Sequence, residues 1–213
     1  MSNNIERRTF SVELRADQEG RSVEGYAALY DNMSDAAGWY IEKIAPGAFK
    51  SALEKKFDTV ALYNHDENFV LARYPDTLEL KEDDKGLWYR IAEMPKSRED
   101  VYEAIKRGDV KGSSFAFTVK SDAWEYRDDD TPIRTITEID TLYDVSPVTY
   151  PFYKDTSVFT NSDAAKRSFD MWAEKQKENE QPNGEDKGEL KAEDVRSFYD
   201  KLDTIRERMK DFF

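Results

Sequence analysis

The sequence predicts a mostly β chain with one or two short helices, either an antiparallel barrel or an α+β domain, followed by a helical C-terminal extension. Three observations support this prediction. Many short segments between residues 5 and 160 alternate apolar and polar side chains, which is typical of half-buried strands. Only two short helical patterns interrupt them. Beyond residue 160 the strand patterns stop and charged helical patterns begin.

The first half of the predicted domain contains strand patterns and one short helix. A turn at residues 17–20 separates the first two strands, and Gly25 inside the second is an expected bulge. Pro46 opens a short helix that reaches Leu53, because proline is well tolerated at a first helical position. The predicted strands are Thr9–Arg15, Ser22–Tyr30, Tyr40–Ile44 and Thr59–His65.

The sequence of the second half of the domain predicts a hairpin, a helix and two further strands. Thr77–Leu80 and Leu87–Ile91 flank a charged turn that ends in glycine, as hairpin strands do. Arg98–Arg107 has its apolar residues on one face and a glycine directly after it, which predicts a helix and its C-cap. Ser113–Val119 and Ile133–Tyr143 follow as strands, separated by an acidic loop.

The C-terminal part predicts two helices joined by a linker. Ser162–Lys177 has a helical pattern, and residues 179–189 have the composition of a linker. We therefore expect a domain at 5–160 and a charged helical extension at 161–213. The last helix, 192–213, is expected either to pack on its own domain or to dock on a partner or a second copy. Its apolar seam has heptad spacing: Val195, Phe198, Leu202, Ile205, Met209 and Phe212.

Composition excludes several classes of function. The formal net charge is −13, which disfavours binding to nucleic acid or to an anionic membrane surface. The chain has no cysteine, so disulfides, thiolate catalysis and cysteine-based zinc sites are excluded. A polar start and the lack of an apolar run of about 20 residues argue against a secretion signal and a membrane span.

His65 is the only histidine, so any chemistry that requires an imidazole depends on it. It stands at the end of a predicted strand, and junctions of strand and loop often present side chains to clefts. An ordinary structural or surface histidine fits the same position. One histidine next to Asp66 lacks the ligand spacing of zinc motifs, and the sequence indicates neither a metal site nor a cofactor.

Two adjacent serines, Ser113 and Ser114, lie on one predicted strand. Because side chains alternate along a strand, Ser113 shares the apolar face of Phe115, whereas Ser114 shares a small-residue face with Ala116. We therefore expect Ser114 to be the accessible hydroxyl and the better candidate nucleophile. A solvated strand serine is the alternative, and the Gly-x-Ser-x-Gly elbow of α/β-hydrolases is absent.

Asp144 follows an apolar strand segment and precedes a proline-restricted one. A carboxylate behind a histidine fixes its tautomer and stabilises the imidazolium that forms when the histidine accepts a serine proton. Asp144 is therefore the candidate third member of a triad with Ser114 and His65. The sequence leaves other carboxylates open for the same role: Asp66, Asp122, Glu138 and Asp140.

Five blocks of the sequence, in this order, resemble the prohead proteases of tailed bacteriophages. Two lie in the N-terminal half, GYAALYD at 25–31 and EKIAPGAF at 42–49. NHD at 64–66 is similar to the segment with the family's catalytic histidine, and RGDVKGSSFAF at 107–117 to the segment with its catalytic serine. DVSPVTYP at 144–151 is similar to a block in which an acidic residue precedes Val-Ser.

The resemblance covers residues of about 9–158. The family places its nucleophile directly before Phe-x-Phe, which falls on Ser114. The family often has methionine where Ser113 stands and glycine where Ala116 stands, so this chain departs from the pattern at both positions. Capsid proteases of herpesviruses have a second histidine in the place of Asp144, and this chain has none.

The resemblance implies the assemblin-like fold, a closed, mainly antiparallel barrel with a few helices around it. It also implies a serine endopeptidase that acts in the host cytoplasm inside the immature capsid. Its substrates are the scaffold protein or the scaffolding segment of the major capsid protein, and often the protease itself. We expect self-association, but no nucleic-acid or membrane partner. A non-enzymatic capsid-assembly protein that keeps the fold is the alternative, as is a protease that is dormant until it assembles inside the particle.

Overall fold

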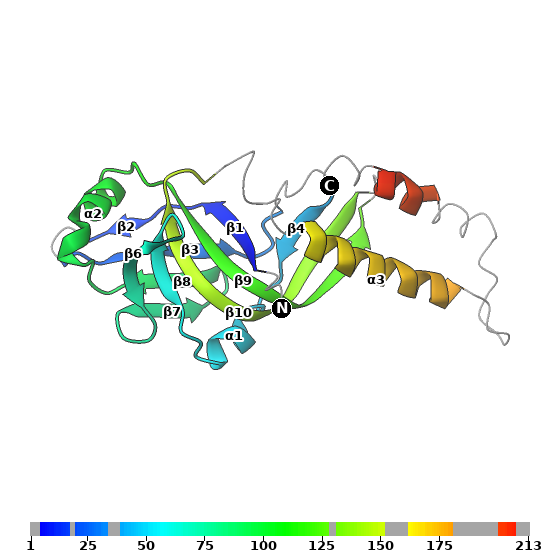
Figure 1. The fold of residues 1–213 in the computed structure, drawn as a ribbon, viewed down its shortest axis with the longest axis horizontal. Helices are drawn as coiled ribbons and strands as arrows, with labels where there is room; N and C mark the ends of the chain where they lie inside the picture. The colour runs from blue at the N-terminus through cyan, green and yellow to red at the C-terminus, as the bar shows by residue number, and fades with distance from the viewer. Residues whose placement is uncertain are drawn as a thin grey trace.

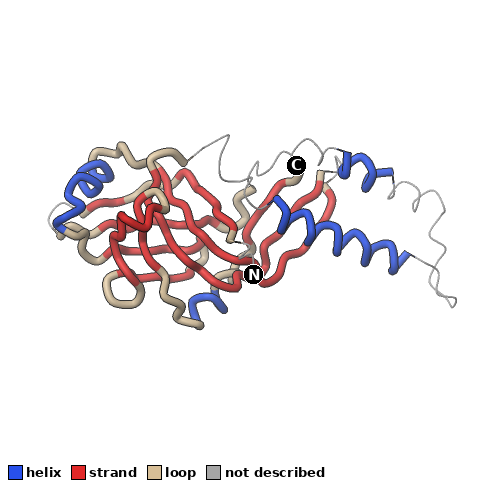
Figure 2. Tube along the Cα trace, in the orientation of Figure 1, coloured by secondary structure: helices blue, strands red, loops and turns tan. Residues whose placement is uncertain are grey.

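The computed structural model describes residues 5–17, 20–33, 39–127, 131–151, 162–180 and 200–207. Within these residues the chain is mostly β with a few helices, which confirms the general fold class. Figures 1 and 2 show the strands forming most of the molecule, with helix α3 (Ser162–Glu180) lying beside the far ends of the longest strands.

Strand pairing within the described residues gives two open sheets. The larger sheet has the order β1 (Glu6–Ser11), β9 (Gly112–Tyr126), β10 (Pro132–Val148), β5 (Val60–Tyr63) and β6 (Asp66–Arg73), with β4 (Ile41–Ile44) also paired to β10. The smaller sheet has the order β2 (Arg15–Ala16), β3 (Val23–Leu29), β8 (Gly86–Ile91) and β7 (Leu78–Glu82). The pairs are antiparallel, except that β10 runs parallel to β4 and β5.

The closed barrel expected from the resemblance is not found. A barrel closes only when its last strand hydrogen-bonds to its first. In the described part of the chain, β1 and β6 are the two ends of the larger sheet and β2 and β7 the two ends of the smaller one. The mainly antiparallel pairing agrees with the prediction, but the closure is not confirmed.

One apolar core lies between the two sheets. Strand β8 contributes Leu87 and Tyr89 to it, and strand β9 contributes Phe115 and Phe117 from the opposite sheet. Helix α2 (Glu99–Lys106) packs its apolar face on the same core through Val101, Tyr102 and Ile105. This packing places the two halves of the domain in fixed relation to β9 and β10, the strands that carry Ser114 and Asp144.

Three elements of the structure differ from the sequence prediction. The predicted strand Thr9–Arg15 is divided, because β1 ends at Ser11 and β2 begins at Arg15. The predicted helix at Pro46 begins only at Lys50, as helix α1 (Lys50–Glu54), since Gly47 has a φ of 85° that no right-handed helix accommodates. Strand β6 was not predicted at all.

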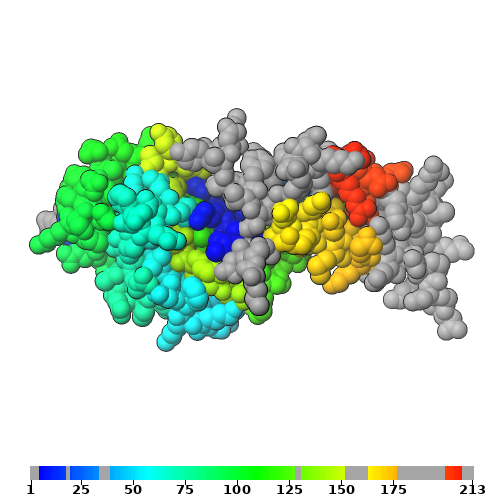
Figure 3. Space-filling model, in the orientation of Figure 1, coloured from blue at the N-terminus to red at the C-terminus, as the bar shows by residue number. Residues whose placement is uncertain are grey.

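The C-terminal extension packs on the chain itself where it is described. A second apolar cluster contains Phe169 of helix α3 together with Trp39 and Trp124. The two tryptophan rings stack with their centroids 5.7 Å apart. Leu202 and Ile205, two positions of the predicted seam, are buried in this cluster. Figure 3 shows α3 (yellow) and residues 200–207 (red) side by side.

Much of the predicted extension lies outside the described residues. This holds for residues 181–189 of the predicted linker and for the other seam positions, whereas residues 179 and 180 belong to α3. The acidic loop at 128–130 also lies outside them. The division of the chain at residue 160 remains a prediction.

Candidate active site

His65 lies in the two-residue turn between β5 and β6. Tyr63 pairs with Asp66 across this turn, and both turn residues have positive φ, 53° for Asn64 and 57° for His65. Positive φ at both positions is what a type I′ hairpin turn requires, and asparagine is favoured in such turns. The turn therefore projects the imidazole from the end of a well-defined strand pair.

Hydrogen bonds tie this turn to the end of β10. The Asn64 N–H donates to Pro147 O over 3.0 Å, and Asn64 Oδ1 accepts the Thr149 N–H over 3.0 Å. Tyr63 Oη and Thr149 Oγ1 lie 2.7 Å apart. His65 is therefore held in place relative to β10, although it belongs to a different hairpin.

The two ring nitrogens of His65 face two different partners. Nδ1 lies 2.7 Å from Asp144 Oδ1, and Nε2 lies 2.6 Å from Ser114 Oγ. A carboxylate oxygen only accepts hydrogen bonds, so Nδ1 carries the hydrogen, and a neutral ring leaves Nε2 as an acceptor for the serine hydroxyl. The structure thus brings the three candidate residues together in the order hydroxyl, imidazole, carboxylate. This arrangement can activate a serine.

The two adjacent serines face opposite sides of β9, as strand alternation predicts. Ser113 Oγ donates to Tyr89 Oη over 3.1 Å in the core, whereas Ser114 faces His65. The expectation that Ser114 is accessible is wrong, because both serines are 0% exposed. The alternation of one strand reports which face a side chain takes, but not what the neighbouring strands place over that face.

Asp144 reaches the site because β10 contains a β-bulge. The register between β9 and β10 shifts between Leu142 and Asp144. Leu142 belongs to the apolar core, whereas Asp144, two residues later, faces His65. In a regular strand two such residues share a face, so the bulge is what turns the carboxylate toward the imidazole.

Ser146 supports the same carboxylate. Its hydroxyl donates to Asp144 Oδ1 over 2.7 Å and lies 3.3 Å from His65 Nδ1. Asp144 is 5% exposed and Ser146 is 0% exposed. A carboxylate this far from water depends on protein donors, and the Ser146 hydroxyl and the His65 Nδ1 hydrogen supply them.

The other carboxylates considered for this role are engaged elsewhere. Among the described residues, Asp144 is the carboxylate that hydrogen-bonds His65. The contacts of the others are Asp66 with Asn68, Asp122 with Arg134, Glu138 with Lys120 and Asp140 with Lys55.

Strand β1 reaches Ser114 from the side opposite to His65. Thr9 is the register partner of Ser114, and Thr9 Oγ1 donates to Ser114 Oγ over 3.1 Å. Ser114 Oγ also lies 2.9 Å from Arg8 O. A hydroxyl has one hydrogen, so Ser114 donates either to the imidazole or to the Arg8 carbonyl. The proton of Ser114 therefore has two acceptors within reach.

A buried ion cluster fixes β1 beside the site. Arg8 pairs with Glu42 and with Glu6 (2.6 Å), and Arg134 pairs with the same two carboxylates at 2.8 and 3.0 Å. Burial alone would lower the pKa of Arg8, but Glu42 and Glu6 outweigh it and raise that pKa well above its usual value. Burial would likewise raise the pKa of Glu6, yet Arg8 and Arg134 lower it. These effects keep Arg8 and Glu6 ionised inside the protein.

The sequence matches the family model described as caudovirus prohead serine protease over residues 10–173. The chain belongs to this family. The matched residues include His65, Ser114 and Asp144, so the three hydrogen-bonded residues lie within the family segment. No curated protein and no solved structure shows a significant match.

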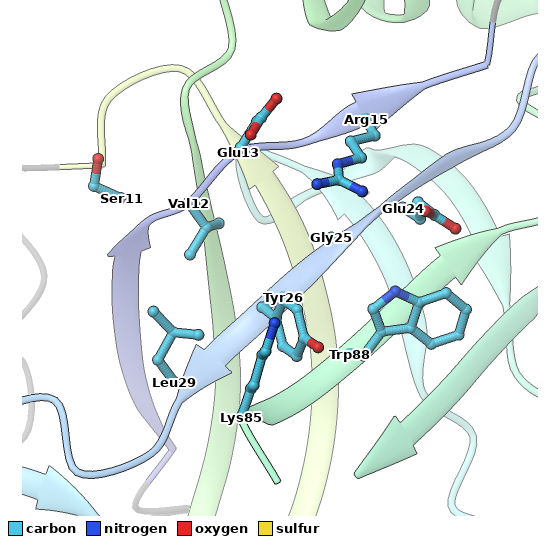
Figure 4. Close-up of a pocket in the computed structure, with 10 residues that line it drawn as sticks. All are labelled: Ser11, Val12, Glu13, Arg15, Glu24, Gly25, Tyr26, Leu29, Lys85 and Trp88. Atoms are coloured by element: carbon cyan, nitrogen blue, oxygen red, sulfur yellow. The ribbon is translucent and has the colours of Figure 1, made fainter. Parts of the chain in front are cut away.

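A groove elsewhere on this chain does not contain the candidate active site. Figure 4 shows it beside β3, with Gly25, Tyr26 and Trp88 among its lining residues, and its volume is about 430 Å³. None of the three hydrogen-bonded residues lines it. In the described part of the chain, no group of three or more His, Asp or Glu side chains could hold a metal ion. No helix there is long and apolar enough to cross a membrane.

Two residues of the site were missed in the sequence. Ser146 stands two positions after Asp144, and strand alternation alone would have placed both on one face. Thr9 carries no such signal, because its contact depends on the register between β1 and β9, two strands separated by about half of the chain.

Proposed function

We propose that this protein is an active serine endopeptidase that trims capsid components during phage maturation. The proposed substrates are the scaffold protein or the scaffolding segment of the major capsid protein, and the protease itself. The proposed place of action is the interior of the immature capsid, in the host cytoplasm. The observation that carries the proposal is the continuous hydrogen-bonded path from Ser114 Oγ through His65 to Asp144.

The proposed reaction proceeds through an acyl-enzyme. Ser114 Oγ attacks the scissile carbonyl carbon, its proton passes to His65 Nε2, and the carbonyl electron pair moves to the oxygen. The adduct collapses, the carbon–nitrogen bond breaks, and His65 returns the proton to the leaving amine. Water then attacks the ester with the help of His65, and Ser114 leaves with the proton. Asp144 holds the ring and stabilises the imidazolium; general-base assistance of this kind is worth about 10²–10⁴-fold.

The burial of Ser114 favours a second candidate function. Since Ser114 is 0% exposed, a peptide can reach its hydroxyl only after a local rearrangement. A non-enzymatic capsid-assembly protein that keeps the protease fold needs no such rearrangement. A protease that is dormant until it associates in the particle is the intermediate case, and it predicts activity that rises with protein concentration.

The proposal is tested by following capsid processing with intact masses. The chain is co-expressed with the major capsid protein of the same phage, as wild type, Ser114→Ala and Ser113→Ala. We expect wild type and Ser113→Ala to shorten the capsid protein, the protease or both. Ser114→Ala should leave both at full length, because it lacks the hydroxyl that faces His65.

Ser113→Ala is the matched control, because its hydroxyl meets Tyr89 in the core. Processing by Ser114→Ala would contradict the assigned nucleophile. Assembled particles without any processing by the wild type would favour the non-enzymatic function. We also propose that residues 161–213 form an extension separate from the domain at 5–160, and that copies of the chain associate, which a concentration-dependent mass by light scattering tests.

A further inference from the structure

We infer that Thr9 is a further catalytic residue, whose hydroxyl stabilises the oxyanion that forms when Ser114 attacks a peptide bond. This inference rests on the proposed protease function and adds to it the missing part of the site. Acyl transfer requires donors for the negative charge that develops on the carbonyl oxygen, in addition to a nucleophile and a base. The donor that we assign, Thr9, belongs to β1, a strand that carries none of the three triad residues.

The two side-chain contacts of Ser114, with His65 and Thr9, lie on opposite flanks. The strand order places β1 on one side of β9, and β10 with the β5–β6 turn on the other. His65 Nε2 therefore approaches Ser114 Oγ from one side and Thr9 Oγ1 from the other, at 2.6 and 3.1 Å. A base and an oxyanion donor must flank a nucleophile in this way, because the attacked carbon binds the serine oxygen and the oxyanion together.

The main chain at Ser114 does not offer an open donor. In many serine hydrolases the N–H of the nucleophile or of its neighbour points at the oxyanion. Here β9 has a paired strand on each side at this position, Thr9 of β1 on one side and Ser146 of β10 on the other, with no shift in register. The N–H groups of such a central strand are used in the ladders. Among the described residues, the Thr9 hydroxyl hydrogen-bonds Ser114 Oγ and can supply a side-chain donor instead.

The hydrogen of Thr9 becomes available as the reaction proceeds. In the resting site, Thr9 Oγ1 donates to Ser114 Oγ. During attack, an electron pair of that oxygen forms the new bond to carbon, so the oxygen becomes a poorer acceptor. The negative charge appears on the oxygen bound to the same carbon, and rotation of the Thr9 hydroxyl transfers its hydrogen bond to that oxygen. The interaction is stronger in the transition state than before it, which is the condition for catalysis.

The ion cluster holds this donor in position. Arg8, the residue before Thr9, is 6% exposed and pairs with Glu6 and Glu42, and Arg134 joins both carboxylates to β10. Each shift of β1 along β9 would separate these buried charges, which is costly. The cluster thus supplies the preorganisation that a transition-state donor requires.

The inference is tested by the rate at which a biotinylated fluorophosphonate labels Ser114 in the full chain. This reagent forms a tetrahedral adduct and needs no knowledge of the cleavage site. Thr9→Val removes the hydroxyl with little change of shape, and Thr9→Ser keeps it. Valine is favoured in strands, so the Val variant should fold, and Thr9→Ala is a second variant without the hydroxyl. Melting temperatures are measured for all of them.

We expect Thr9→Val and Thr9→Ala to be labelled about 10²-fold more slowly than wild type, and Thr9→Ser to keep most of the rate. The pH midpoint of labelling should stay unchanged, because His65 and Asp144 are untouched. Wild-type rates in Thr9→Val, or an equal loss in Thr9→Ser, would overturn the inference. A moved midpoint would mean that Thr9 only orients Ser114. If the wild type itself is not labelled, the proposed function fails first, and the role of Thr9 fails with it.

Discussion

Two buried polar groups, the ion cluster and the candidate active site, both include residues of β1 and β10, and they are built in opposite ways. The ion cluster of Glu6, Arg8, Glu42 and Arg134 satisfies every charge it buries with an opposite one. The candidate active site, in contrast, places one hydroxyl hydrogen between two acceptors, His65 and the Arg8 carbonyl. The ion pairs of the cluster hold the backbone of β1, β4 and β10 in place. The second acceptor at the active site leaves the Ser114 hydroxyl hydrogen free to move between His65 and the Arg8 carbonyl.

The difference assigns stability to one group and reactivity to the other. A buried charge that loses its partner is strongly destabilising. A hydroxyl that loses its acceptor can rotate to another. Substitutions in the cluster should therefore act through folding, and substitutions in the triad should act on the reaction while the fold remains.

The largest expected effect on stability comes from Arg134→Met. The residue is 1% exposed, and its removal takes the paired cation from Asp122 and leaves Glu6 and Glu42 with Arg8 alone. We expect a loss of about 3–5 kcal/mol in the free energy of unfolding, measured with urea. Lys120→Ala, which breaks an exposed pair with Glu138, is the control and should change little. Equal effects of the two variants would remove the contrast between the cluster and the surface.

A moderate effect is expected for Ser146→Ala at the triad. Asp144 loses one of its two donors, and a hydrogen bond to a charged group contributes about 1.5 kcal/mol, or about tenfold in rate. Fluorophosphonate labelling rates of Ser114 measure the effect, and a melting temperature checks that the fold remains. A wild-type labelling rate in Ser146→Ala would contradict the role of this hydrogen bond.

The smallest expected effect is a pH dependence in the cluster. Burial alone would raise the pKa of Glu6, but Arg8 and Arg134 lower it by more than burial raises it. The pKa of Glu6 in the folded protein therefore lies below the ordinary 4.5. The stabilisation by ionised Glu6 is thus fully present above pH 4.5 and is lost as the pH falls through the folded value. Glu6→Gln should melt below the wild type at neutral pH, and the gap should narrow in acid. A gap that stays constant would contradict the pairing.

Local patterns in the sequence predicted much of the fold, because alternation reports one face of one strand. It identified β3, β8 and the face that Ser114 takes on β9, and Ser113 does meet the core through Tyr89. It could not report whether the sheets close or whether Ser114 is buried, since both depend on which strands become neighbours. The catalytic roles of Ser114, His65 and Asp144 stay predictions.

Two local features explain why the site was only partly visible in the sequence. The bulge after Leu142 interrupts alternation at the residue that matters most, Asp144. The polar residues at the start of β6 conceal a strand behind the His65 turn. Arg134, inside a predicted apolar strand, was not recognised as a buried cation because its partners come from β1 and β4.

The most direct test of the account is the mapping of fluorophosphonate adducts by peptide mass spectrometry, in wild type and in His65→Ala. The account predicts an adduct on Ser114 in the wild type and none in His65→Ala, although both variants melt cooperatively at similar temperatures. A folded wild type without an adduct on Ser114, or equal labelling in His65→Ala, would contradict the claim that Ser114, His65 and Asp144 form a working catalytic triad.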